Sequence, residues 1–370
     1  MLTLNLPATV GDSVAQPRLL VMTNGTALPT ASNVHIKKSR LSESGTFSVT
    51  FPVEASSPYW FDPDVGTFEL PIEIYLGFLP LGQNEGTQPY SLLFGGVVDH
   101  AHYTPAGNSV IVSGRDRSAR LIERELSGQS FLNFTASEAI AQLAMDVGLT
   151  PDVDTTSGLV GQFYQYEHKA HGLRGMHRFQ TAWDFCVGMQ RRYGYDLWVD
   201  GNTLYFKAPN ENDEILYLNW KQADSETKYP VSSVWNLALS RRIAYSDSTA
   251  VTVSAWDARQ RTSHSATYPS DISTGGPRYA YTAAVGTTLD ECAALARQKY
   301  NETMAHARTL SMNVHPSLSI SPRQRVILQG TGTSFDGVPY TVDDVIFSLS
   351  GPRVTQSITL RNRSNLGNVS

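Results

Sequence analysis

Cysteine is nearly absent from this 370-residue sequence, which holds only Cys186 and Cys292. These two residues lie far apart inside helix-like segments, so we expect buried free thiols rather than a disulfide or a metal site. Long apolar runs are also missing, since none approaches the roughly 20 residues that cross a bilayer. The amino-terminal MLTLNLPATVGDS has no basic stretch before an apolar core, so we expect no signal peptide and a soluble chain.

Charge is sparse as well. Charged residues make up 17% of the chain, below the roughly 25% of a typical soluble domain. A protein that hides much of its surface in an assembly tolerates such a low fraction. The 29 basic and 34 acidic residues give a net charge of -5, which argues against a dedicated nucleic-acid binder because such proteins carry a basic patch.

The length of the chain predicts two or three domains. Residues 1–125 alternate apolar and polar side chains between Gly and Pro turns, a pattern typical of the short strands of a barrel or sandwich. Residues 126–214 mix helical and strand patterns, and residues 215–370 return to strands with one helix at about 288–308. We therefore predict a mainly β chain in which two β-barrel domains flank a small α/β insert.

Local signals predict three helices and one hairpin. The segments Thr135–Glu138, Thr181–Asp184 and Thr288–Glu291 each have the spacing of a capping box, which starts a helix. Gly194 ends the second of these helices. The dipeptide Asp200-Gly201 lies between two alternating runs, which predicts a tight β-hairpin.

The stretch VSGRDRSARLIERELSG, at positions 112–128, changes from a strand pattern to a helical one. Its Arg115 and Asp116 form either a charged reactive pair or part of a structural junction. No second acidic group or histidine stands at useful spacing beside Asp116. We therefore favour the junction, with Gly114 as the turn and Asp116 as the cap of the next helix.

His168, His171 and His177 are the best metal candidates. The (i, i+3) spacing of the first two places two imidazoles on one face of a helical turn. No Cys, Asp or Glu completes the set, and Gly172 and Gly175 indicate a loop. Structural or exposed histidines are therefore the favoured interpretation.

Three further segments offer weaker chemistry. The sequence Gly330-Thr331-Gly332 resembles a fragment of a phosphate-binding loop but lacks the following Lys. Glu123 and Glu125 are the right residue type for a glycosidase pair, yet no pattern sets them in a pocket. The aromatic loop Pro58–Phe61 fits either packing or contact with a glycan or a partner. We assign no catalytic, cofactor-binding or metal residue.

Three groups of segments carry a family resemblance. They are residues 112–121; then 181–185 with 193–195 and 198–206; and finally 289–307, 322–326 and 335–342. In this order they resemble the baseplate hub proteins of tailed phages, the late control D group, whose architecture is shared with the base of the type VI secretion spike. The resemblance spans roughly residues 90–362, and before residue 90 only the β character matches.

The resemblance implies a homotrimer. Each chain would give two tail-tube-like β-barrel domains, so that three chains form a pseudo-sixfold ring around a DNA channel. One face would meet the tail tube protein, and the other would seat the central spike protein. The α/β insert would lie outside the ring, toward other baseplate proteins, with the hairpin tip at Asn202 exposed and tolerant of an insertion.

The resemblance also implies a structural protein of the virion tail, made in the host cytoplasm. It brings no enzymatic activity and no cofactor, because the family has no shared catalytic or metal residues. DNA would pass through the channel without specific binding.

Two other classes of function stay open. A tail-tip enzyme that cleaves peptidoglycan would need a pair of acidic groups or a metal site in a cleft. A receptor- or glycan-binding β-protein would use Pro58–Phe61 as its contact. A trimeric mass favours the hub, whereas a monomer with lytic activity favours the enzyme. The sequence does not distinguish a phage from a tailocin or a secretion system, or a contractile from a non-contractile tail.

Overall fold

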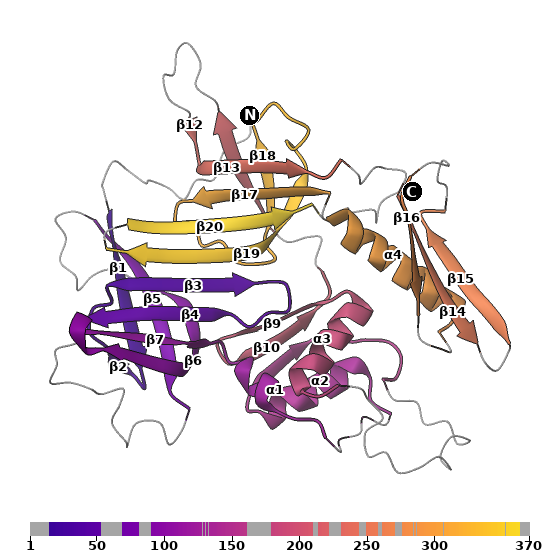
Figure 1. The fold of residues 1–370 in the computed structure, drawn as a ribbon, viewed down its shortest axis with the longest axis horizontal. Coiled ribbons are helices and arrows are strands. Elements are labelled where there is room, and N and C mark those ends of the chain that lie inside the picture. The colour runs from indigo at the N-terminus through magenta and orange to yellow at the C-terminus, as the bar shows by residue number, and fades with distance from the viewer. Residues whose placement is uncertain are drawn as a thin grey trace. The chain divides into compact units, whose positions relative to one another are not determined.

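The architecture is described from a computed structural model (Figure 1). It describes residues 15–52, 69–80, 90–127, 129, 131, 133–160, 179–209, 214–221, 231–243, 249–257, 261–270, 276–283, 285, 287–305, 307–351 and 353–362. The chain divides into two compact units. The first contains Met1–Glu211, His315–Ile320 and Asp344–Gln356, and the second contains Asn212–Val314, Ser321–Asp343 and Ser357–Ser370.

The first unit is built on an antiparallel sheet. Its strands are β1 (Ala15–Thr23), β2 (Thr26–Ala27), β3 (Asn33–Ser39), β4 (Thr46–Pro52), β5 (Pro71–Pro80), β6 (Ser91–Thr104), β7 (Ser109–Arg115) and part of β19 (Pro339–Ser350). They neighbour one another in the order β19-β3-β4-β7-β6-β5-β1-β2. In β4 the alternate residues Phe47, Val49 and Phe51 are buried in one core, as the period of two predicts.

The same unit holds the α/β insert. It comprises α1 (Ala119–Glu123), α2 (Ala136–Asp146), α3 (Ala182–Tyr193) and the sheet β8-β10-β9, formed by Thr150–Val153, Thr203–Lys207 and Asp196–Asp200. The capping boxes at Thr135 and Thr181 are both present, and Gly194 ends α3 with a positive φ. The hairpin predicted at Asp200-Gly201 is confirmed, because β9 and β10 pair antiparallel across it.

The second unit is again mostly β. It contains β11 (Ile215–Lys221), β12 (Val231–Ser232), β13 (Val234–Arg241), β17 (Arg308–Val314), β18 (Arg325–Gln329) and parts of β19 and β20 (Arg353–Arg361). A separate three-stranded sheet of β14 (Ala250–Asp257), β15 (Thr262–Tyr268) and β16 (Arg278–Thr282) packs against α4 (Leu289–Ala305). The capping box at Thr288 is confirmed by its reciprocal hydrogen bonds with Glu291.

The predicted fold class is confirmed as mainly β with few helices and a large antiparallel sheet. Closure of the sheets into tube-like barrels stays a prediction, as do the boundaries of the three expected domains. Both cysteines are free and buried, as predicted. Burial raises the pKa of the Cys186 thiol to about 12. None of the helices among the described residues combines the length and apolarity that a membrane crossing requires.

Candidate functional site

The end of β7 and the turn that leads into α1 form a polar junction, and the Arg115 side chain makes three of its hydrogen bonds. The Arg115 guanidinium donates from Nε to Asp99 Oδ2 at 2.6 Å and from Nη2 to Asp99 Oδ1 at 2.9 Å. Its Nη2 also donates to Glu123 Oε1, at 2.8 Å, on α1. These bonds, the Asp99 pair foremost, raise the pKa of Arg115 above its usual value. Arg115 therefore stays charged and connects β6, β7 and α1.

A β-bulge places Asp99 within reach of Arg115. Val98 is paired with Gly114 and His100 with Ser113, so Asp99 is the extra residue of β6. A bulge re-aims the side chain of the inserted residue. The ion pair therefore depends on a local irregularity in the backbone of β6.

Gly114 is needed for close packing of strands rather than for a turn. It lies inside β7, and a Cβ added to it would fall 1.9 Å from the carbonyl oxygen of Val97. A Cβ on Gly96 would fall 2.3 Å from the carbonyl oxygen of Arg115. Gly96 and Gly114 thus allow the backbones of β6 and β7 to approach closely. The expectation of a turn at Gly114 is wrong.

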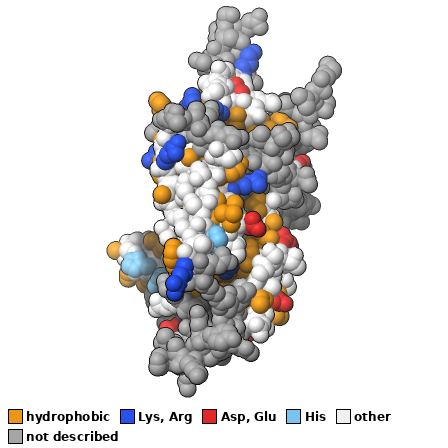
Figure 2. All heavy atoms as spheres, turned by 90° about the vertical axis from the view of Figure 1, so that its right-hand side faces the viewer, with side chains coloured by type: hydrophobic (Ala, Val, Ile, Leu, Met, Phe, Trp, Pro, Cys, Tyr) orange, Lys and Arg blue, Asp and Glu red, His pale blue; other side chains and the backbone are white. Residues whose placement is uncertain are grey.

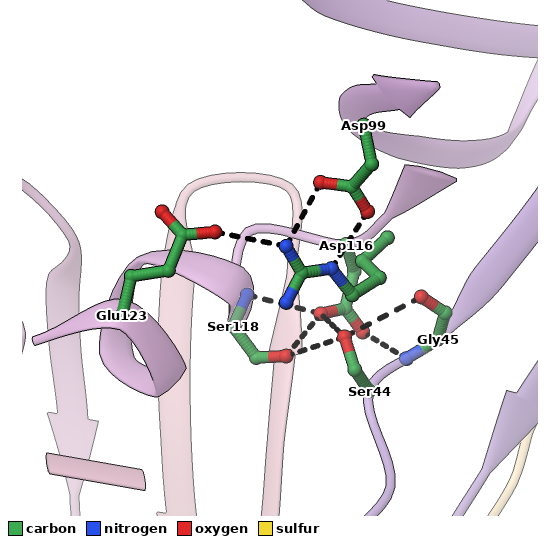
Figure 3. Close-up of polar contacts among 7 residues, drawn as sticks. Ser44, Gly45, Asp99, Asp116, Ser118 and Glu123 are labelled. Carbon is green, nitrogen blue, oxygen red and sulfur yellow. Dashed lines mark hydrogen bonds and ion pairs between the residues drawn. The ribbon is translucent and has the colours of Figure 1, made fainter. Parts of the chain in front are cut away.

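Asp116 bridges two segments far apart in the sequence (Figure 3). Its Oδ2 accepts from the Gly45 N–H at 2.6 Å, and its Oδ1 accepts from the Ser118 N–H at 2.9 Å. The hydroxyls of Ser44 and Ser118 also donate to Oδ1. The Asp116 N–H donates to the Gly45 carbonyl at 2.8 Å, which completes the link to the β3–β4 loop.

The prediction that Asp116 is the N-cap of the following helix is wrong, because the N-cap lies two residues further along the chain. The N-cap of α1 is Ser118, whose side chain makes no capping hydrogen bond. The Asp116 carboxylate instead closes a turn by accepting from the Ser118 N–H, and it links this turn to the β3–β4 loop by accepting from the Gly45 N–H. Burial raises the pKa of Asp116, while the donors on Ser118, Gly45 and Ser44 act in the opposite direction.

The β3–β4 loop is also held by the α/β insert. Arg40 Nε donates to Asp196 Oδ1 at 2.7 Å, and both side chains are at most 10% exposed. Two residues further on, the Ser42 hydroxyl donates to Gln190, and the Ser42 carbonyl accepts from Trp183 Nε1 at 3.3 Å. A buried ion pair and two hydrogen bonds thus fix the insert to the β3–β4 loop, in addition to the contacts of Asp116 with the same loop.

The contacts of this junction are structural rather than reactive. Arg115 and Asp116 bind different partners and do not face one another as a reactive pair. The hydrogen bonds described above all join groups of the same chain. The arrangement therefore holds backbone segments together, which favours the structural interpretation of the stretch over the reactive one.

Asn202, at the tip of the β9–β10 hairpin, is exposed as expected, but it is also anchored by hydrogen bonds. The Asn202 carbonyl accepts from the Thr150 N–H at 2.9 Å, and its Nδ2 donates to the Gly148 carbonyl at 3.1 Å. Its Oδ1 lies 3.4 Å from Arg117 Nη1. The expected tolerance of an insertion stays a prediction, and an insertion at this position would have to preserve or replace these bonds.

Of the other candidates from the sequence, Glu123 belongs to this junction and the rest do not. His168, His171, His177 and the Pro58–Phe61 loop lie outside the described residues. Among the residues that are described, no cluster of three or more His, Cys, Asp or Glu could hold a metal ion. Glu123 binds Arg115, and Glu125 forms an isolated bridge with Thr181 through its backbone.

The turn at Gly330-Thr331-Gly332 is filled by the chain itself. The Asp336 carboxylate accepts from the N–H of Thr331 at 3.1 Å and from that of Gly332 at 2.8 Å. These bonds and the Thr331 hydroxyl lower the pKa of Asp336 against the effect of its burial. The backbone donors that an anion would use are therefore occupied.

No protein-family model and no curated protein matches the sequence. Solved structures do match. A tail protein from Neisseria meningitidis is 13% identical, with a TM-score of 0.67 over 94% of this chain and 97% of that one. The 43 kDa tail protein of prophage MuSo2 from Shewanella oneidensis is 15% identical, with a TM-score of 0.66 over 92% and 97%.

A third match is a component of the E. coli type VI secretion system, described as similar in structure to T4 bacteriophage tail proteins. It is 11% identical, with a TM-score of 0.50 over 93% of this chain and 77% of that one. At these identities the likeness establishes a shared fold. The chain therefore has the fold of phage tail proteins and of type VI secretion proteins related to them, and the resemblance found in the sequence is confirmed at that level.

Proposed function

We propose that the chain is the baseplate hub of a phage tail or a related contractile injection device. Three copies form a pseudo-sixfold ring that joins the tail tube to the central spike and lets DNA pass. The observation that carries this proposal is the end-to-end match with the Neisseria tail protein, which covers 97% of that chain. The match also covers 94% of this chain, which supports a structural role in the virion tail.

The junction suits this role. A ring that transmits force between tube and spike needs its attached parts held firmly. The bonds around Asp116 and the buried Arg40–Asp196 pair fix the α/β insert to the sheet of the first unit at two points. In the proposed ring the insert lies outside the β-wall, because a helical segment within the wall would interrupt strand pairing.

The overall charge suits passage of DNA without binding. On the face that Figure 2 shows, basic and acidic side chains are scattered among uncharged and hydrophobic groups. The whole chain carries a small acidic surplus, with 34 acidic and 29 basic residues. A basic channel would bind each passing phosphate, since every neutralised phosphate adds salt-dependent affinity.

Sedimentation or light scattering tests the proposal directly. We expect a species of three times the chain mass of 40.6 kDa, alone or after addition of the tail tube protein. A strict monomer under both conditions would overturn it. A gel shift with duplex DNA at physiological salt is expected to show no binding. Affinity tighter than about 1 micromolar with a steep salt dependence would contradict passive passage.

A further inference from the structure

Strand β6 presents two histidines side by side on an exposed surface. His100 and His102 are separated by one residue, so the alternation of a strand places both on one face of the sheet. Both are exposed, whereas Ala101 between them is half-buried. The pairing with β7 sets Ala101 opposite Val112, which is fully buried in the core. The two imidazoles therefore stand on the face opposite the core.

The register of β7 leaves this face open. His100 lies opposite Ser113 and His102 lies opposite Ile111, whose side chain is 38% exposed. Neither neighbour brings a charge that would repel a cation. The nearest carboxylate in the strand, Asp99, already accepts two hydrogen bonds from Arg115. Among the described residues, neither imidazole hydrogen-bonds to another group.

Two imidazoles at this spacing are a chelating pair. Successive residues on one face of a strand have Cα atoms about 7 Å apart. Each side chain reaches several ångströms from its Cα, so one nitrogen of each ring can approach a single ion at the roughly 2.0–2.1 Å of a zinc–nitrogen bond. Neutral imidazole suits Zn²⁺, Ni²⁺ and Cu²⁺, and a two-residue site leaves further positions for water.

We propose that His100 and His102 form a bidentate site for one divalent transition-metal ion per chain. The site goes beyond the proposed hub function and does not depend on it. Its ligands bind as neutral imidazoles, so bound metal displaces protons and binding weakens as the pH falls. The open positions on the ion would be available to water or to a side chain of another protein that meets this face.

His35 provides a matched control. It is also exposed and lies on the same face, since it pairs with Ser48, which pairs with Ser113 opposite His100. Two strands separate it from His100, a distance of roughly 14 Å at the usual strand spacing. It is therefore a single imidazole on the same face, with Nδ1 at 3.1 Å from the Ser348 hydroxyl, and it is too far away to share an ion with the pair.

The test is calorimetric titration of the full chain with Zn²⁺ at pH 7.5. We expect the unmodified chain to bind Zn²⁺ saturably. The His100→Gln and His102→Gln variants should each bind one Zn²⁺ fewer per chain, whereas His35→Gln should bind the same number as the unmodified chain. Electron paramagnetic resonance of the Cu²⁺ complex is expected to show two nitrogen ligands, and one or none in either variant. Since all three residues are exposed, circular dichroism should show an unchanged fold.

Two results would overturn the site. One is the absence of saturable Zn²⁺ binding by the unmodified chain. The other is binding that is unchanged in both His100→Gln and His102→Gln, which would place the metal elsewhere. A companion His168→Gln/His171→Gln variant that abolishes all binding would identify the other histidine segment as the place and would also count against the site on β6.

Discussion

Replacing Asp116 with Ala tests whether this residue is a bridge or a helix cap. A capping side chain accepts a hydrogen bond from the first turn of one helix, and its loss costs about 0.5–2 kcal/mol of stability. Asp116 instead accepts from the backbone N–H of Gly45 and from that of Ser118, about 70 residues apart in the chain. Leaving a buried donor without an acceptor costs about 1–3 kcal/mol each. We therefore expect Asp116→Ala to lower the free energy of unfolding by about 2–6 kcal/mol.

Asp116→Asn is the matched control. It keeps the size of the side chain and one of the two acceptors. It also removes a charge whose burial raises the pKa of the carboxyl. Loss of one acceptor and relief of the buried charge offset each other, so we expect a change within about 1 kcal/mol.

The raised pKa of Asp116 also determines how its contribution to stability depends on pH. A carboxyl whose pKa is raised by folding binds its proton more tightly in the folded chain. Its contribution to stability is full below the ordinary Asp pKa of about 3.9 and is lost as the pH rises through the folded pKa. The Asn variant has no carboxyl at this position to titrate. Its free energy of unfolding should therefore rise relative to that of the unmodified protein as the pH rises from 4 toward 7.

Urea unfolding measures these differences, and hydrogen exchange locates them. In Asp116→Ala the amides of Gly45 and Ser118 should exchange faster, while those of the Asn variant should change less. Glu123→Gln removes only the exposed partner of Arg115 and should cost about 0–1 kcal/mol. An Ala variant within about 1 kcal/mol of the unmodified protein, with both amides still protected, would refute the bridge.

Three further outcomes follow from other contacts. Gly114→Ala should prevent folding of the first unit or destabilise it by several kcal/mol, because its Cβ would fall 1.9 Å from a carbonyl oxygen; a soluble variant with unchanged thermal unfolding would contradict this. Asp196→Ala should cost about 3–5 kcal/mol by leaving Arg40 charged and buried, and Arg40→Met with Asp196→Leu should recover most of that loss in urea unfolding. Cys186 and Cys292 should resist a thiol reagent at pH 8 until the chain is unfolded, because burial raises the pKa of both thiols; rapid labelling of the folded chain would show that they are accessible.

Features encoded within a few residues could be predicted from the sequence. The capping boxes at Thr135, Thr181 and Thr288 each place acceptor and donor three positions apart, so the whole interaction is visible in a short window. The Asp200-Gly201 turn likewise sets the register of its own two strands. The β–α/β–β order then follows from the periodicity of each segment.

The junction could not be predicted, because its partners are distant in the chain. Ser44 and Gly45 lie more than 70 positions before Asp116, and no local pattern links them. The bond between Arg115 and Asp99 needs a bulge that shifts the register by one residue. Local rules therefore assigned Asp116 to the nearest helix, whereas tertiary contacts assign it to the β3–β4 loop.

Strand β19 has a consequence for how the protein is made. Its residues Asp344–Ser350 pair with Asn33–Ser39 of β3, across some 300 positions of sequence. During synthesis at about 5–20 residues per second, β3 would wait roughly 15–60 s for its partner strand. Until then one edge of β3 has unpaired backbone N–H and C=O groups, which can pair with a strand of another nascent chain. The first unit is thus completed late, and a truncated chain that ends before β19 should aggregate rather than fold.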